Sequence, residues 1–296
     1  MIVLDIAGVL FSISGRNCSV IFNDEPAYKT FIRQERDEIA DISIDVVVGG
    51  LPDISAAKRV FDSESSWFLS SLGEYRYLVL DPPSIDGGPL WIARFRPSIE
   101  TVTIFCDEQL ATWKDGNCFI DNPIRYPLDQ VLLMLYLAEK GGSILHAAGI
   151  AIHGKGYIFP GRSGAGKSTL SRFFKASPTA RLLSDDRVVA RISGRNISVY
   201  GTPWPGEEGV AENACVPLSG IFFLSHGKQN AVKEITGRDA LERLMPIISI
   251  PWFDKKSLLS SLSLCEDLVL NIPSYELTFK PGREVAEFLG KFLSKA

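Results

Sequence analysis

The spacing of apolar residues changes near residue 122 and divides the chain into two parts. Before that point, short apolar runs alternate with polar residues or lie between loops rich in glycine and proline, as strands of a half-buried sheet do. In Asp41 to Val48, isoleucine and valine recur at every second position. Strands are predicted over residues 1–11, 41–48, 67–69, 75–80, 90–95 and 101–106. The pattern predicts a β-rich N-terminal domain over residues 1–122, interpreted as a recognition or oligomerisation module.

Helical spacing begins directly after this domain. The tripeptide Asp121-Asn122-Pro123 marks the joint, and Pro127 suits the first turn of a helix. The apolar residues that follow recur at helical spacing and are Leu128, Val131, Leu132, Leu135 and Tyr136. Gly141-Gly142 ends this pattern. We therefore predict a second domain over residues 123–296 that opens with this helix.

Two apolar runs, Ile144–Ile152 and Tyr157–Phe159, follow the helix and are joined by the short segment His153–Gly156. Such a segment cannot carry a parallel crossover, which needs about a dozen residues. The two strands are therefore predicted to form an antiparallel hairpin. Another short strand, Arg181–Ser184, comes after a connection long enough to make it parallel to the second strand of that hairpin.

The remaining chain mixes both patterns. A second hairpin is predicted from residues 188–192 and 197–200, and a buried strand over 218–224 with residues 231–235 pairing back onto it. Helices are predicted over residues 236–248 and 257–270 and from Pro281 onward, with an edge strand over 275–279. The expected fold class is α/β (α+β), with a mixed, partly antiparallel sheet in the second domain and a smaller β-rich N-terminal domain.

Composition and charge narrow the class of protein. The chain of 296 residues is 46% apolar and 22% charged, with a net charge of −4, so a general nucleic-acid surface is not expected. No apolar run reaches the length of about eighteen residues that a membrane helix needs. The five cysteines are scattered without a C-x-x-C pair, as in a reducing compartment. The expectation is a cytoplasmic protein without nucleic-acid or membrane partners.

The strongest motif for a binding site follows the first hairpin. Gly161–Ser168 reads G-R-S-G-A-G-K-S, a complete P-loop pattern. Glycines allow successive backbone N–H groups to face phosphate oxygens, the lysine adds charge, and the final hydroxyl can ligate Mg²⁺. The pattern predicts an ATP site that requires Mg²⁺; the alternative is a glycine-rich turn that binds no nucleotide. The predicted binding residues are Gly161, Arg162, Ser163, Gly164, Ala165, Gly166, Lys167, Ser168 and Thr169.

Two adjacent carboxylates, Asp185 and Asp186, follow the strand that is predicted to run parallel to the P-loop strand. Parallel strands end at the same edge of a sheet, so this pair is predicted to lie beside the bound phosphates. One carboxylate can hold Mg²⁺ and the other can take a proton from an attacking hydroxyl. A solvated turn is the alternative for the pair, and the sequence does not decide which aspartate takes which role.

Further candidates carry weaker signals. His146, in the first strand of the hairpin, can assist proton transfer or contact a phosphate; the alternative is an ordinary hydrogen-bonded strand residue. Glu207, in the loop Gly201–Gly209, can help to bind Mg²⁺, can contact the acceptor, or can be a solvated acid on a rigid turn. Arg162 and Arg187 are candidates for stabilising the γ-phosphate, although the alternative for each is a surface arginine. Ser168, Asp185, Asp186 and Glu207 make up the predicted metal set.

Together these features resemble the C-terminal domain of HPr serine kinase/phosphorylase, namely a histidine, an antiparallel hairpin, GxSGxGKS, a short helix and an Asp-Asp pair. The string GRSGAGKSTLS is also similar to the P-loop of ATP-dependent phosphoenolpyruvate carboxykinase, which shares that fold. The resemblance covers residues 125–296 and implies transfer of the γ-phosphoryl group of ATP to a serine of a protein or peptide. It also implies roles by position: phosphate and Mg²⁺ binding for Lys167 and Ser168, metal binding and the base for Asp185 and Asp186, and assistance for His146.

The chain departs from that family at Thr169, where HPr kinases usually carry an acidic residue; this weakens the case for phosphorylase activity. No HPr-binding signature is found late in the chain. The sequence is most similar to stand-alone HPr-kinase-like proteins of ribosomal peptide biosynthesis, such as lasso-peptide tailoring kinases and SynChlorMet cassette proteins. For those proteins the implied acceptor is a small peptide.

Three functions share the predicted ATP site. The first is a serine kinase that acts on a peptide or small protein, with a homo-oligomer as a candidate assembly. The second is a nucleotide-gated adaptor that binds a peptide and transfers nothing. The third is a kinase of a small molecule with a free hydroxyl. The P-loop is the same in all three, whereas the Asp-Asp pair favours chemistry and the β-rich domain favours recognition.

Overall fold

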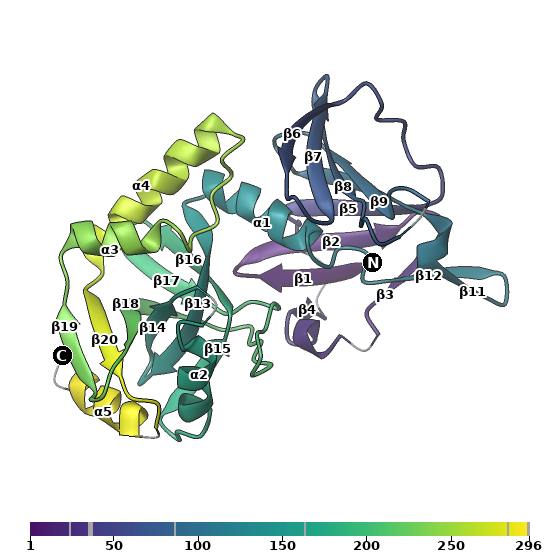
Figure 1. Cartoon of the computed structure of the whole chain (residues 1–296). Coiled ribbons are helices and arrows are strands. Elements are labelled where there is room, and N and C mark those ends of the chain that lie inside the picture. Colours follow the sequence, from purple (N-terminus) through teal and green to yellow (C-terminus); the bar gives the residue numbers. More distant parts are fainter. Residues whose placement is uncertain (24, 35–37, 86, 163, 283, 295–296) are drawn as a thin grey trace. The chain divides into compact units, whose positions relative to one another are not determined.

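The structure is a computed structural model that describes residues 1–23, 25–34, 38–85, 87–162, 164–282 and 284–294. Two compact units divide the chain, Met1–Tyr136 and Leu137–Ala296 (Figure 1). Mixed sheets dominate both units and helices are few, which confirms the broad α/β class. No helix among the described residues is long and apolar enough to cross a membrane.

The first unit contains a large mixed sheet. Its strands are β1 Ile2–Ile6, β2 Val9–Gly15, β4 Ile32–Arg33, β5 Ile42–Val48, β6 Lys58–Asp62, β7 Trp67–Leu72, β8 Tyr75–Leu80, β9 Trp91–Phe95 and β10 Thr101–Cys106. The order is β4-β1-β2-β5-β10-β9-β8-β7-β6, and β5 pairs in parallel with both β2 and β10. A smaller sheet has the order β11-β12-β3, from β3 Ser19–Ile21, β11 Ala111–Lys114 and β12 Asn117–Asp121. Short 3-10 helices cover Pro26–Tyr28 and Glu108–Leu110.

The alternating pattern in β5 produces the burial it predicts. Ile42, Ile44, Val46 and Val48 are buried, and the residues between them are not, because successive side chains of a strand face opposite sides. The strand predicted over residues 67–69 extends to Leu72, and β7 and β8 form an antiparallel hairpin with a turn at Gly73-Glu74. Gly73 takes a positive φ of 60° there, which favours glycine.

Helix α1, Leu128–Glu139, begins where the helical spacing predicts, and Gly141 follows it with φ 71°. Its first turns belong to the first unit, because the Tyr28 hydroxyl donates to the buried Asp129 carboxylate at 2.5 Å. The division between the compact units therefore falls inside α1, after Tyr136, and not at the change of sequence pattern after residue 122.

The second unit is built around a sheet that closes on itself. Its strands are β13 Gly142–Ile152, β14 Lys155–Pro160, β15 Ala180–Ser184, β16 Arg187–Ser193, β17 Asn196–Tyr200, β18 Cys215–His226, β19 Ala231–Glu234 and β20 Ser274–Phe279. Pairings run from β14 through β13, β16, β17 and β18, and β18 pairs in parallel with β14 to close the ring. Helices α2 Lys167–Lys175, α3 Gly237–Leu244, α4 Lys255–Asn271 and α5 Glu284–Leu293 complete the unit.

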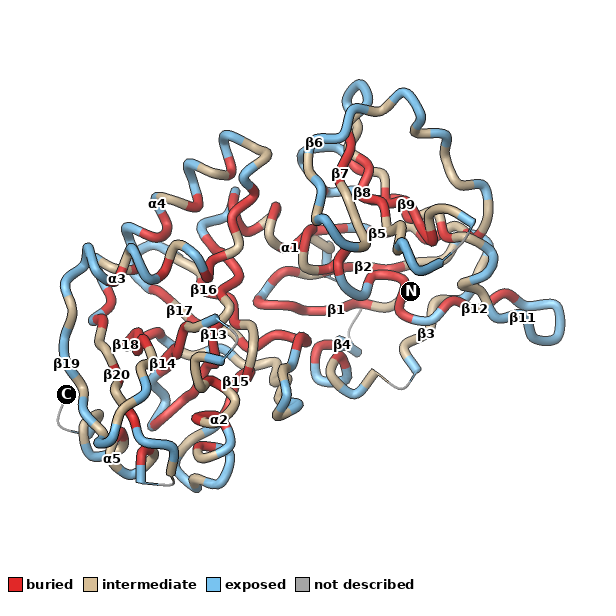
Figure 2. The backbone as a smooth tube through the Cα atoms, viewed as in Figure 1, coloured by how far each residue is buried: buried red, intermediate tan, exposed pale blue. Residues whose placement is uncertain are grey.

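Apolar residues pack on both faces of this sheet, and Figure 2 shows the buried backbone concentrated in its strands. One core includes Leu145, Ile158 and Ile221 together with residues of α3 and α4. The other includes Phe159, Phe174 and Phe222 together with residues of α2 and α5. The strands are thus fixed from both sides, and the loops at their ends receive a rigid support.

The long strand β13 organises the edge of the sheet at which the P-loop begins. It forms the predicted antiparallel hairpin with β14, and its other side pairs with β15 near its end and with β16 near its start. Because β14 and β15 are both antiparallel to β13, they run parallel to each other, as predicted, with β13 between them. The two residues between β15 and β16 are Asp185 and Asp186. They lie opposite the stretch of β13 that also pairs, on its other side, with the end of β14.

Two local predictions near the C-terminus are wrong. Strand β19 does not pair back onto β18, because β20 lies between them, parallel to β18 and antiparallel to β19. For the same reason β20 is not an edge strand. The sequence predicts a hairpin at the turn after His226. The strand that pairs with β18 there is instead β20, which follows β19, α3 and α4 in the chain. Helix α3 is capped by Thr236, whose hydroxyl accepts the backbone N–H of Asp239.

Candidate functional site

The P-loop joins β14 to α2, and its conformation depends on glycine. Gly164 and Gly166 have φ values of 83° and 97°, which side chains disfavour. A Cβ on Gly166 would also lie 2.7 Å from the Phe279 ring. Gly166 is the N-cap residue of α2 and carries no side chain that could accept the first helical N–H groups, so these groups can bind an anion. Ser163, one of the predicted binding residues, lies outside the described residues.

Lys167, the first residue of α2, is folded back under this loop. It is only 6% exposed, and its ammonium donates to the carbonyl of Gly161 at 2.7 Å and to that of Arg162 at 3.4 Å. Burial lowers the pKa of Lys167 below its ordinary value, although the nearby Asp186 carboxylate acts in the opposite direction. The site therefore holds a partly desolvated cation at the place where the sequence predicts phosphate.

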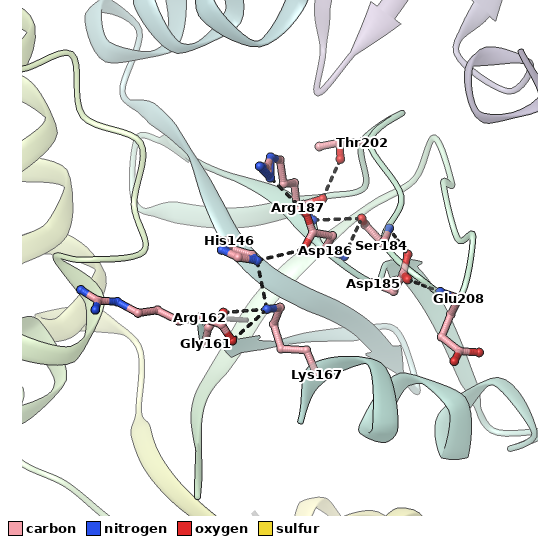
Figure 3. Close-up of polar contacts among 11 residues, drawn as sticks. His146, Gly161, Arg162, Lys167, Ser184, Asp185, Asp186, Arg187, Thr202 and Glu208 are labelled. Atoms are coloured by element: carbon pink, nitrogen blue, oxygen red, sulfur yellow. Dashed lines mark hydrogen bonds and ion pairs between the residues drawn. The ribbon is translucent and has the colours of Figure 1, made fainter. Parts of the chain in front are cut away.

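His146 connects this lysine to the Asp-Asp pair (Figure 3). Its Nε2 atom lies 3.0 Å from Lys167 Nζ and 2.9 Å from Asp186 Oδ1. A single ring nitrogen cannot donate to a carboxylate and accept from an ammonium at the same time. When Nε2 carries the proton, it binds Asp186, and Lys167 keeps its two carbonyl partners.

Asp186 lines the cavity beside His146. Its second oxygen, Oδ2, accepts from Arg187 Nη1 at 3.0 Å, and its side chain remains 28% exposed. Burial alone would raise the pKa of Asp186, but the hydrogen bond from His146 and the charge of Arg187 outweigh burial and lower that pKa. Asp186 is therefore ionised at neutral pH, and each of its two carboxylate oxygens has a partner that orients the group.

Asp185 has different surroundings, as the alternation along an extended chain predicts. It is 2% exposed, and its carboxylate accepts three backbone N–H groups, from Gly206 at 2.9 Å, Glu208 at 2.7 Å and Val210 at 3.1 Å. Three such bonds occupy most of the lone pairs of a carboxylate. Asp185 thus fixes the loop Gly201–Gly209 against the end of β15.

The same loop is fixed to the P-loop helix by basic residues of α2. Arg172 pairs with the Glu208 carboxylate at 2.8 Å, and Lys175 donates to the Glu208 carbonyl at 2.9 Å. Gly206 packs so closely on the Asp-Asp pair that a Cβ there would lie 2.9 Å from Asp185 Oδ2. Glu207 is exposed and lines the cavity beside this anchored segment, so its carboxylate remains available to a ligand.

These residues enclose one cavity of about 690 Å³, a size typical of small-ligand sites. Its lining comes from the P-loop, β13, the Asp-Asp pair, the loop after β17 and the end of β18. The lining residues are His146, Gly164, Gly166, Lys167, Ser168, Thr169, Asp185, Asp186, Gly206, Glu207 and His226. Most side-chain candidates of the sequence pattern therefore meet in one place.

The predicted metal set does not form a cluster of protein ligands. Among the residues that the structure describes, no group of three or more His, Cys, Asp or Glu side chains is arranged to hold a metal ion. Mg²⁺, however, is usually bound by one or two carboxylates together with substrate phosphates. Ser168, Asp186 and Glu207 all line the cavity and offer oxygen ligands of that kind.

The two candidate arginines have different positions. Arg187 is 31% exposed at its side chain and pairs with Asp186, so it lies at the site. Arg162 is exposed, and its side chain extends away from Lys167 in Figure 3. Its carbonyl, and not its guanidinium, contacts the lysine.

Two residues of the cavity, Gly206 and His226, are missing from the sequence-based set, although Gly206 belongs to the loop that it singles out. His226 ends β18 and lines the cavity, whereas the sequence pattern identifies only a turn at this position. Local sequence gives no signal for it, because its place beside the P-loop depends on the parallel pairing of β18 with β14.

The anchoring by Asp185 leads to a stability prediction. In Asp185→Asn the carboxamide nitrogen cannot accept the N–H groups that the carboxylate accepts, so backbone donors lose their partner in a buried place. We expect a loss of about 1–3 kcal/mol in the free energy of unfolding, measured by urea denaturation. Asp267→Asn, an exposed position on α4, is the matched control; equal stability of the two variants would contradict the anchoring role.

Comparison with known proteins gives little beyond this geometry. No family model matches the sequence, and no curated protein matches it. Among solved structures, the chain is similar to the Hpr(Ser) kinase/phosphatase from Coxiella burnetii, with a TM-score of 0.30 and 10% sequence identity. The match covers 51% of this chain and 94% of that chain. Likeness at this level carries no argument about activity, so a function has to be argued from the site itself.

Proposed function

We propose that the protein is an ATP- and Mg²⁺-dependent kinase that transfers the γ-phosphoryl group to a serine hydroxyl of a peptide or small protein. One observation carries the proposal: the 2.9 Å pair of His146 and Asp186 adjoins the P-loop lysine within a single cavity. A site that only bound nucleotide would need the loop and the lysine. An oriented, ionised carboxylate beside them is what transfer to a hydroxyl requires.

In this proposal the P-loop and Lys167 bind and orient the phosphates. The backbone N–H groups at the start of α2 and the lysine ammonium face the transferring group, and catalysis comes from positioning and electrostatic stabilisation. Mg²⁺ bound with ATP would neutralise charge on the phosphates; Ser168 and Glu207 are the residues that would hold it. Lys167 gives up its carbonyl partners for phosphate oxygens when ATP binds.

Asp186 is the proposed proton acceptor. Its Oδ1 or Oδ2 atom receives the serine proton as the oxygen attacks, and His146 and Arg187 keep the carboxylate oriented. Asp185 then has an indirect role, because it holds the loop that carries Glu207. In this proposal Asp186 is the base, Asp185 anchors the loop, and neither aspartate is a metal ligand.

The finer fold and the setting belong to the same proposal. We propose an HPr-kinase-like, PEP-carboxykinase-type P-loop arrangement for the second unit. The hairpin of β13 and β14, the P-loop, α2 and the Asp-Asp pair, in that order, support it. We further propose that the N-terminal unit recognises the acceptor and that the protein acts in the cytoplasm.

The test is acceptor mass spectrometry. The protein is incubated with ATP, Mg²⁺ and candidate acceptors, namely short peptides encoded beside its gene and HPr. We expect one acceptor to gain a single phosphoryl group on a serine, and the gain to be absent with Lys167→Ala. ADP release that depends on the acceptor is the second readout.

Other outcomes are equally informative. Tight ATP binding without transfer to any peptide, but with transfer to a small hydroxyl compound, would identify a small-molecule kinase. Binding with no transfer at all would favour the adaptor. Absence of nucleotide binding would overturn the proposal altogether.

A further inference from the structure

His226 lies at the C-terminal end of β18, at the same edge of the sheet as the P-loop. Strands β14 and β18 are parallel, with Ile158 paired to Ile221, so the C-terminal ends of both strands lie at the same edge of the sheet. The P-loop continues from the end of β14, and His226 ends β18. The proposed kinase mechanism assigns no role to this histidine.

Two contacts place the imidazole against the apex of the P-loop. Its Nε2 atom is 3.4 Å from the carbonyl oxygen of Gly164. Its ring centroid lies 5.5 Å from that of Phe279, the directly opposite residue on β20. Phe279 is fully buried and therefore gives the histidine a rigid support.

The same two rings limit the space beside Gly166. A Cβ on this glycine would lie 2.7 Å from Phe279 Cζ and 3.2 Å from His226 Cε1. The segment from Gly164 to Gly166 thus rests on the His226–Phe279 pair. Both glycines have positive φ values, and glycine loses more conformational freedom on ordering than any other residue.

We propose that His226 is a positioning residue of the nucleotide site: it holds the apex of the P-loop in the shape that binds the phosphates of ATP. This inference rests on the proposed function, because it assumes that the P-loop binds a nucleoside triphosphate. A carbonyl oxygen only accepts, so Nε2 carries the proton at this contact. The hydrogen bond orders the glycines before ATP arrives, which lowers the entropy that binding has to overcome.

The proposal is tested by the dissociation constants for ATP and ADP, measured by calorimetry for the wild type and for His226→Ala, His226→Gln and His153→Asn. We expect the dissociation constant to rise about 5- to 10-fold in His226→Ala. His226→Gln should restore most of the affinity, because the glutamine amide nitrogen can donate to the same carbonyl. His153 is exposed with φ 51°, a conformation that Asn tolerates, so His153→Asn is the matched control and should bind as the wild type does.

Kinetics separate positioning from chemistry. KM for ATP should rise in His226→Ala in proportion to the dissociation constant, with kcat changed less than twofold. A wild type that binds no nucleotide would overturn the proposed function. A wild type that binds, with affinity unchanged in His226→Ala, would overturn only the role of His226. Loss of affinity without rescue by His226→Gln, or a fall in kcat at unchanged KM, would also overturn the positioning role.

Discussion

Replacing Asp186 with Asn is expected to lower the rate of phosphoryl transfer by about 10²- to 10⁴-fold, the usual contribution of a general base. The amide cannot take the proton of the acceptor serine, and it no longer carries the charge that His146 and Arg187 orient. ATP binding should be nearly unchanged, and the free energy of unfolding should fall less than in Asp185→Asn, because the Asp186 carboxylate pairs with the side chains of His146 and Arg187 and does not anchor a loop. Single-turnover transfer to the identified acceptor measures the effect.

The neighbouring aspartate makes this prediction specific. Asp185→Asn should act mainly through stability, whereas Asp186→Asn should act mainly through kcat, although the two residues are adjacent in sequence. Asp267→Asn on α4 controls for the loss of one charge. A transfer rate in Asp186→Asn within twofold of the wild type would show that another group takes the proton.

The lowered pKa of Asp186 determines the pH range over which this base stays ionised. Its pKa is held below the ordinary carboxyl value, so the carboxylate remains ionised as pH falls from neutral through that ordinary value. The stabilisation that goes with this lowered pKa is present at neutral pH and is lost only as pH falls through the folded-state pKa.

Removing the Lys167 side chain is expected to have the second largest effect. Lys167→Ala should lower the transfer rate by about 10²- to 10³-fold, as the loss of one preorganised electrostatic group does, and should also weaken ATP binding. The ammonium is buried and partly desolvated, so it interacts with phosphate more strongly than a surface lysine would. Radiolabelled phosphoryl transfer and equilibrium binding of ATP measure the two effects separately.

Lys155→Ala provides the control for this change. Lys155 is exposed at the start of β14, on the same hairpin but at the opposite end of the strand from the P-loop. It should retain the wild-type rate. If both lysine variants transferred phosphate equally well, the P-loop would not be the phosphate site.

The sequence was sufficient for those features that depend on local chemistry. The P-loop pattern requires glycines where φ is positive, as at Gly164 and Gly166. The short segment between β13 and β14 leaves only an antiparallel hairpin. The alternation in β5 and the capping pair Thr236 and Asp239 likewise determine their own local structure. In each case the physical cause acts within a few residues along the chain.

The different environments of Asp185 and Asp186 could not be assigned from sequence. Both are aspartates at the end of a strand, but one accepts three N–H groups from a loop more than twenty positions later, and the other meets His146 from β13. Alternation along the chain predicts only that they differ. Which one is buried depends on where the later loop returns to the sheet.

The glycine-rich P-loop pattern, its hairpin and most of the residues around the cavity can be identified from the sequence alone. The other features of the site depend on which strands become neighbours in the folded chain. The parallel pairing of β18 with β14 brings His226 to the P-loop, and the insertion of β20 beside β18 places Phe279 beneath it. Neither contact can be predicted from the local sequence, because each joins residues that lie far apart along the chain.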